Sequence, residues 1–212
     1  MIGHGTRMAQ APATKSRALK GLAALAALAG MALLAACETP APAGKLPDLT
    51  FSHLPQIRLP VQRVETAVRY VQPMREPNVE HLFPVSPVRT MERWAQQRLK
   101  ADGGAQTARL VIVDASVKET KLPRDTSMRG TFTKQQSERY DARVEATLEI
   151  QGGVGSTKSV ANANASRWIT VREDASLNER ERIKFDLIEA LMKDFDAEFE
   201  KSALLYLRNQ PR

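Results

Sequence analysis

Cys37 is the residue whose type and position predict the most definite chemistry, because it is the only cysteine and it ends an uncharged apolar run. The run extends from Gly21 to Ala36 and follows four basic residues with no acidic residue among them. A basic segment, a short apolar segment and small residues before a cleavage point are typical of a secretory signal peptide. A transmembrane helix needs about 20 apolar residues, more than this run provides. The pattern therefore predicts a signal peptide over residues 1–36, with translation starting at Met1 or Met8.

The residues from Leu34 to Cys37 resemble the lipobox of bacterial lipoproteins. The resemblance implies that the Cys37 sulfur receives a diacylglycerol, that the chain is cleaved between Ala36 and Cys37, and that the new N-terminus is acylated. Two or more acyl chains hold a protein stably on a membrane. In enterobacterial lipoproteins an aspartate after the cysteine signals retention in the inner membrane. Glu38 in that place favours the outer membrane, with the protein facing the periplasm.

The rest of the chain offers little further chemistry. His53 and His81 do not lie beside acids or a cysteine in a metal-ligand pattern, and the glycines at 152–155 lack the lysine of a phosphate-binding loop. Removing residues 1–36 also lowers the formal net charge from +7 to +3, so the basic composition does not indicate nucleic-acid binding. We therefore expect no catalytic residue, no metal, no cofactor and no nucleic-acid partner, in a protein that is not an enzyme.

Proline recurs through residues 37–60, which favours an extended tether between the anchor and a folded domain. A plain spacer and a specific binding segment are both open for this stretch. Apolar residues in its last third are candidates for docking on the domain: Phe51, Leu54, Ile57 and Leu59. Residues 61–212 then form a single domain whose fold rests on its core, because no second cysteine is present to form a disulfide.

Alternating or β-branched apolar residues predict four strands in this domain, at 61–71, 110–117, 139–150 and 159–171. A first helix is predicted to begin at Ser86 and to end at Gly103 and Gly104. A second begins at a capping box of Ser176 and Glu179. Its apolar stripe is Ile183, Leu187, Leu191, Phe195 and Phe199. The order strand, helix, three strands, helix predicts an α+β two-layer sandwich, with a four-stranded, largely antiparallel sheet and both helices on one face.

The connection from Thr120 to Glu138 is long for a hairpin and rich in basic residues. Basic side chains mixed with apolar ones suit an anionic lipid surface or a protein partner, and a solvated flexible tip is equally open. The candidate contact residues are Lys121, Arg124, Arg129 and Lys134.

The order of elements after a lipobox resembles two groups of envelope lipoproteins. These are the auxiliary lipoproteins of ABC-type transport systems and the lipopolysaccharide-assembly lipoproteins. The Arg-Trp stretch within Met91–Leu99 resembles the first helix of the former group. The resemblance implies a non-enzymatic accessory component of envelope lipid or lipopolysaccharide transport, with an envelope protein as partner. The alternative is a structural lipoprotein that only scaffolds a complex.

Overall fold

The computed structural model describes residues 46–123, 127, 134–152 and 157–208. The predicted anchor and cleavage site, Cys37 and Ala36, lie outside these residues. Arg124 and Arg129 of the predicted contact loop also lie outside them.

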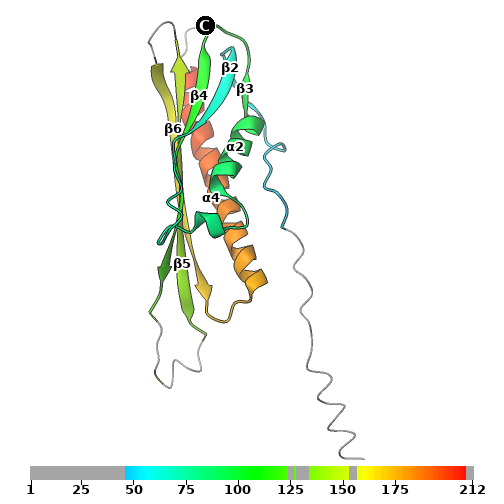
Figure 1. Cartoon of the computed structure of the whole chain (residues 1–212). Coiled ribbons are helices and arrows are strands. Elements are labelled where there is room, and N and C mark those ends of the chain that lie inside the picture. The colour runs from blue at the N-terminus through cyan, green and yellow to red at the C-terminus, as the bar shows by residue number, and fades with distance from the viewer. Residues whose placement is uncertain (1–45, 124–126, 128–133, 153–156, 209–212) are drawn as a thin grey trace, which may run out of the picture. The chain divides into compact units, whose positions relative to one another are not determined.

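Four strands form one layer of the fold: β2 (Arg63–Val68), β4 (Thr107–Lys121), β5 (Gln136–Gln151) and β6 (Thr157–Arg172). Their order across the sheet is β2-β4-β5-β6 (Figure 1). β5 is antiparallel to both of its neighbours, whereas β2 runs parallel to β4. A parallel neighbour needs a crossover connection, and the helix between β2 and β4 supplies it. The predicted α+β class and four-stranded sheet are confirmed, with one parallel pairing that makes the sheet mixed.

Two helices cover the same face of this sheet (Figure 1): α2 (Pro87–Arg98) and α4 (Leu177–Arg208). The Ser86 hydroxyl caps α2 by accepting the Arg89 main-chain N–H at 3.5 Å. At the start of α4, the Glu179 carboxylate accepts the Ser176 main-chain N–H at 2.8 Å. The Ser176 hydroxyl accepts the Glu179 N–H in return at 3.3 Å, which completes the predicted capping box.

The sequence does not predict a second, two-stranded sheet, in which β1 (Ile57–Leu59) pairs in parallel with β3 (Leu99–Ala101). The expectation that the first helix continues to Gly103 and Gly104 is wrong, because α2 ends at Arg98 and the chain enters β3 directly. The glycines follow β3 instead. Gly104 has a φ of 129°, and a Cβ there would lie 2.6 Å from the Pro60 carbonyl oxygen, so this close approach requires glycine.

The second half of the predicted tether belongs to the core. Leu49, Phe51 and Leu59 are buried. The Phe51 main-chain N–H donates to Gln97 Oε1 at 2.6 Å, and the Arg93 guanidinium donates to the Leu49 carbonyl oxygen at 3.0 Å. The chain from Leu49 onward is therefore fixed to α2.

The sheet buries one face against the helices. On β5, every second residue from Tyr140 to Ile150 is buried, as the alternation predicts. On β4, Ile112 and Ala115 would face opposite sides of a regular strand. A bulge between Ile112 and Asp114 shifts the register, and this keeps both apolar side chains in the core.

Trp94 and Arg98 join α2 to α4. The Trp94 ring meets Phe195 and Phe199 edge-on, with centroid distances of 4.9 and 4.7 Å. Its indole N–H donates to Asp196 Oδ1 at 2.7 Å, and the Arg98 Nε donates to the same oxygen at 2.6 Å. The predicted stripe on α4 is thus core, and the Arg-Trp stretch of α2 is packed into it.

Candidate functional site

The predicted basic contact residues are only partly described. Lys121 is the last residue of β4 and is exposed. Lys134 lies 2.8 Å from Asp174 Oδ2, so its charge already has a partner. Because β4 and β5 extend into the predicted loop, the connection between them is shorter than Thr120 to Glu138.

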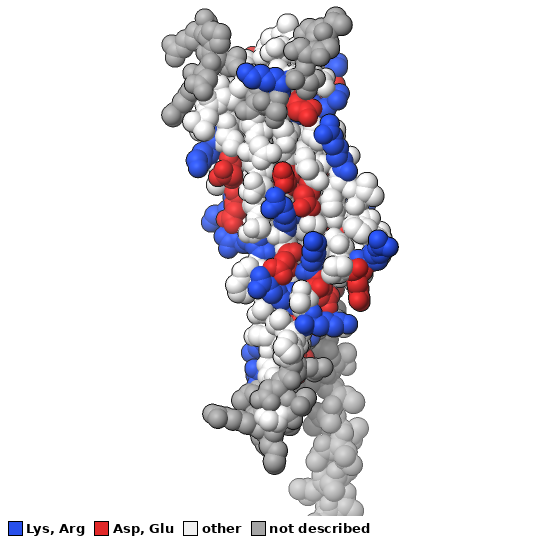
Figure 2. Space-filling view, turned by 90° about the vertical axis from the view of Figure 1, so that its left-hand side faces the viewer, with Lys and Arg blue, Asp and Glu red and all other residues white. Residues whose placement is uncertain are grey.

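The sheet face away from the helices carries interleaved basic and acidic side chains (Figure 2). Arg143 lies 3.3 Å from Asp114 on the neighbouring strand and 2.7 Å from Glu145 on its own. Arg139 pairs with Asp141 at 2.6 Å. Such pairs compensate the charges within the sheet, so this face carries no patch of purely positive or purely negative charge.

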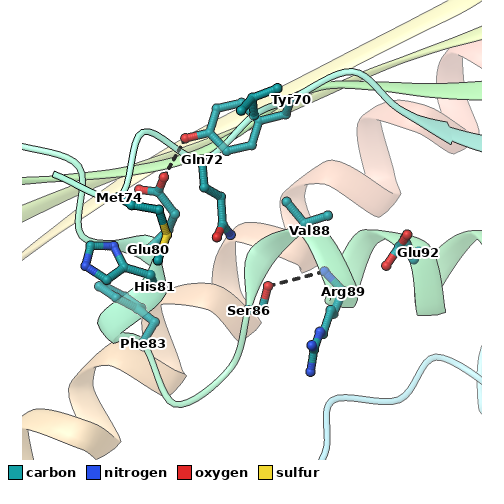
Figure 3. A pocket seen from close by; sticks show the side chains of 11 residues that line it. Tyr70, Gln72, Met74, Glu80, His81, Phe83, Ser86, Val88, Arg89 and Glu92 are labelled. Carbon is teal, nitrogen blue, oxygen red and sulfur yellow. Dashed lines mark hydrogen bonds between the residues drawn. The ribbon is translucent and has the colours of Figure 1, made fainter.

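A groove of about 700 Å³ lies between the segment that follows β2 and the N-terminal half of α2 (Figure 3). In Figure 3, Glu80, His81 and Phe83 lie on one side of it, and Ser86, Val88 and Arg89 lie on the helix side. Glu80 and His81 belong to the short 3-10 helix η1 (Glu80–Leu82). We call this feature the Arg89 groove; its lining residues are Tyr70, Val71, Gln72, Met74, Glu80, His81, Phe83, Ser86, Val88, Arg89 and Glu92.

The Glu80 carboxylate, only 1% exposed, organises one wall of the Arg89 groove. It accepts the Tyr70 hydroxyl at 2.7 Å, the Asn78 side-chain amide at 3.4 Å and the Val117 main-chain N–H at 3.3 Å. A buried charge is costly unless it is hydrogen-bonded, and these three donors satisfy it. They also tie η1 to β4, which fixes the wall in place.

The Tyr70 hydroxyl remains protonated over the ordinary pH range. Burial raises the pKa of Tyr70, and the hydrogen bond to the Glu80 carboxylate raises it further. A protonated phenol is what the carboxylate needs as a donor. Tyr70 and Glu80 therefore form a fixed structural pair within the groove wall.

Arg75 and Arg89 carry uncompensated charge, and of these two only Arg89 lines the Arg89 groove. Every other arginine whose side chain is described has an ion-pair partner. Arg89 lines the groove and is exposed, and Arg75 is exposed next to Met74 in the sequence. Two exposed guanidinium groups without internal partners are suited to an anionic group from outside.

Large apolar side chains are exposed in the chain segment before α2, and Val71 and Met74 among them line the Arg89 groove. Val71 is 82% exposed, Met74 61% and Leu82 59%. Met74 has a φ of 55°, a left-handed backbone conformation that is uncommon for a non-glycine residue. Single exposed apolar residues are ordinary, but neighbouring ones mark interaction sites. The groove thus combines apolar contact surface with a guanidinium group, which is the chemistry that an anionic amphiphile requires.

Sequence reasoning did not find the Arg89 groove. Apart from Val88, Arg89 and Glu92 of α2, its residues lie in an irregular, proline-containing stretch, 69–86, where no periodicity separates exposed apolar residues from buried ones. The available signal was Met74 and Leu82 themselves, apolar residues outside any predicted strand or helix. Within the described residues, no group of three or more histidine, cysteine, aspartate or glutamate side chains is placed to hold a metal ion. No helix of the described part is long and apolar enough to cross a membrane.

Several solved structures are similar to this chain. No protein-family model and no curated protein matches the chain. Rare lipoprotein B from Shewanella oneidensis is similar at 12% identity, with 69% of this chain and 98% of that chain covered and a TM-score of 0.35. Lipoprotein B from Nitrosomonas europaea is similar at 13% identity, with 80% and 99% covered and a TM-score of 0.38. A putative lipoprotein from Caulobacter crescentus CB15 is similar at 10% identity, with 70% and 93% covered and a TM-score of 0.35. All three are bacterial lipoproteins by description.

Proposed function

We propose that this protein is a bacterial envelope lipoprotein, held on the membrane by an acylated Cys37, that acts as a non-enzymatic accessory component of envelope lipid or lipopolysaccharide transport. The anchor rests on the Leu34 to Cys37 sequence and the uncharged run before it. The transport role rests on one observation. The Arg89 groove combines one unpaired arginine, Arg89, with exposed apolar side chains.

An anionic amphiphile matches both halves of this surface. Its acyl portion contacts Val71 and Met74, and its phosphate lies against Arg89. Arg75, which follows Met74 in the sequence, is the second unpaired arginine. Apolar burial contributes about 25 cal/mol per Å². Because the groove covers only part of one acyl chain of the lipid, the affinity should be modest. Modest affinity suits a component that passes a lipid on, because tight binding would slow its release.

Direct lipid binding tests the proposal. The full chain, in a non-ionic detergent, is titrated with a fluorescent phosphatidylglycerol. The double variant Arg75→Gln/Arg89→Gln should bind at least about fivefold more weakly, which corresponds to about 1 kcal/mol. Raising the salt concentration should reduce the difference, because exposed charges are screened.

Arg58→Gln/Arg182→Gln is the matched control, because it removes two exposed arginines that already have partners, Asp102 and Asp186. This control should bind as the wild type does. Equal binding by the wild type and the Arg75/Arg89 variant contradicts the proposed use of the groove. A chain that binds no lipid but retains an envelope protein supports the scaffolding alternative instead.

A further inference from the structure

The Arg89 groove contains an acidic side chain, Glu92, that the contacts of the proposed lipid do not use. Glu92 lines the groove and is half-buried, and its carboxylate makes no hydrogen bond or ion pair within the described residues. A carboxylate that is partly withdrawn from water needs a donor or a cation to compensate its charge. Glu80, the other carboxylate of the groove, has such donors inside the protein. Glu92 is therefore the acidic group that is available to a ligand.

Arg89 and Glu92 do not compensate each other in this structure. They lie three residues apart on α2, a spacing that places two side chains on neighbouring turns of one helix face. In Figure 3 the Arg89 guanidinium points away from the Glu92 carboxylate. Even where a pair at this spacing forms, it is weak, so a ligand that contacts both groups can replace it. The groove thus offers a cation and an anion one helical turn apart.

Gln72 adds a free polar group from the opposite wall of the groove. Its side chain is half-buried and extends from the segment after β2 toward α2 (Figure 3). Within the described residues, the Gln72 amide takes part in no hydrogen bond. An amide is both a donor and an acceptor, so it suits a phosphate oxygen or an ester carbonyl group. Polar groups without internal partners therefore lie on both walls.

The balance of free charge selects the kind of headgroup. A purely anionic headgroup would pair with Arg89 but would bring a like charge close to Glu92, which is unfavourable. A phosphoethanolamine headgroup compensates both side chains. Its phosphate accepts hydrogen bonds from the guanidinium, and its ammonium, two methylene groups further on, reaches a carboxylate on the next helical turn.

We propose that Glu92 selects the headgroup at the Arg89 groove and favours a phospholipid whose phosphate carries an ammonium group, as in phosphatidylethanolamine. The inference rests on the proposed function and narrows it, because the phosphate is still the anionic group that meets Arg89. The acyl chain keeps its contacts with Val71 and Met74. Glu92 adds a contact that a headgroup without an amine does not make.

A comparison of two lipids tests this preference. The full chain, in a non-ionic detergent, is titrated with phosphatidylethanolamine and with phosphatidylglycerol of identical acyl chains. The fluorophore is attached to an acyl chain, so that the amine stays free. The wild type should bind phosphatidylethanolamine about threefold to fivefold more tightly, the effect of one partly exposed ion pair. Raising the salt concentration should reduce this preference, because exposed charges are screened.

Variants of the two charged residues separate their roles. Glu92→Gln keeps the shape of the side chain and should bind the two lipids with equal affinity. Glu92→Lys should invert the preference, because a cation there repels the ammonium and attracts the anionic headgroup. Arg89→Gln should weaken the binding of both lipids, because both carry the phosphate. Glu181→Gln is the matched control, because it removes an exposed carboxylate of α4 outside the groove and should keep the wild-type preference.

Equal affinity of the wild type for the two lipids, or an unchanged preference in Glu92→Gln with a wild-type melting temperature, overturns the role of Glu92. If Arg89→Gln still weakens both lipids in that case, the proposed function stands without this inference. A wild type that binds neither lipid, or an Arg89→Gln protein that binds both as tightly as the wild type, overturns both proposals. A preference that is lost in Glu92→Gln, inverted in Glu92→Lys and kept in Glu181→Gln supports the selection by Glu92.

Discussion

At the scale of single residues, the Asp196 carboxylate connects the two helices. It accepts both the Trp94 indole and the Arg98 guanidinium, and Arg98 is only 1% exposed. A buried cation that loses its partner costs about 3–5 kcal/mol. The Glu200 carboxylate lies 3.0 Å from the Arg98 guanidinium and compensates part of its buried positive charge.

Asp196→Ala is therefore expected to lower the free energy of unfolding by about 3 kcal/mol, near the lower end of that range. Urea denaturation followed by circular dichroism measures the change. Asp194→Ala, two residues away, removes an exposed pair with Arg167 and should cost about 1 kcal/mol or less. Similar losses for the two variants would show that Asp196 has no special role.

The lowered pKa of Glu138 should account for part of the acid sensitivity of the fold. Burial alone raises the pKa of Glu138, but hydrogen bonds from Arg180 at 2.6 Å and Tyr140 at 2.9 Å outweigh it and hold the pKa below its usual value of 4.5. A depressed pKa contributes stability that is present above the unfolded value and is lost as the pH falls through the folded value. Wild-type stability should thus decline below about pH 4.5, and the Glu138→Gln variant should show a shallower decline in urea titrations across this range. Parallel curves for the two proteins would contradict the assignment.

At the scale of elements, periodicity decided which parts of the fold could be predicted. β5 alternates through its whole length and α4 repeats an apolar stripe over several turns, so both follow from the sequence. β1 and β3 have three residues each, too few to show a period. Leu99 fits the helical spacing of α2, but its main chain pairs with Ile57, so tertiary pairing ends the helix earlier than the pattern indicates.

The predicted basic loop remains an expectation. Lys134 pairs with Asp174 and two of the four basic residues lie outside the described part of the chain. The groove, by contrast, depends on contacts between segments that are distant in sequence, such as the Glu80 carboxylate with the Val117 N–H. Single-sequence patterns do not contain this kind of pairing, which explains why that site was missed.

Phe195→Ala tests whether the α4 stripe is core. Phe195 is fully buried and lies between Trp94 and Phe199, so truncation leaves a cavity that should cost about 3–5 kcal/mol. Thermal and urea unfolding measure the loss. Leu205→Ala, which removes an apolar side chain of the same helix that is 57% exposed, is the control and should change stability by about 0.5 kcal/mol or less. A Phe195→Ala protein with wild-type melting would show that the stripe is a partner surface.

At the scale of the whole molecule, we expect the proposed anchor and the folded domain to be separable. Core contacts of the described residues begin at Leu46, nine residues after Cys37 in the sequence. Removing the anchor should therefore change where the protein resides without changing how the domain folds. This separation makes the acylation site testable by itself.

Cys37→Ala should abolish incorporation of labelled palmitate and block cleavage between residues 36 and 37, because the thiol is the group that receives the lipid. Labelling of the full chain in bacterial cells, with the mass of the purified product, measures both effects. The melting transition of the domain should remain as in the wild type. Glu38→Asp is the matched control, because it keeps the cysteine and should retain the label while moving the protein toward the inner-membrane fraction. A Cys37→Ala protein that still carries labelled palmitate would exclude Cys37 as the anchor, whatever the domain binds.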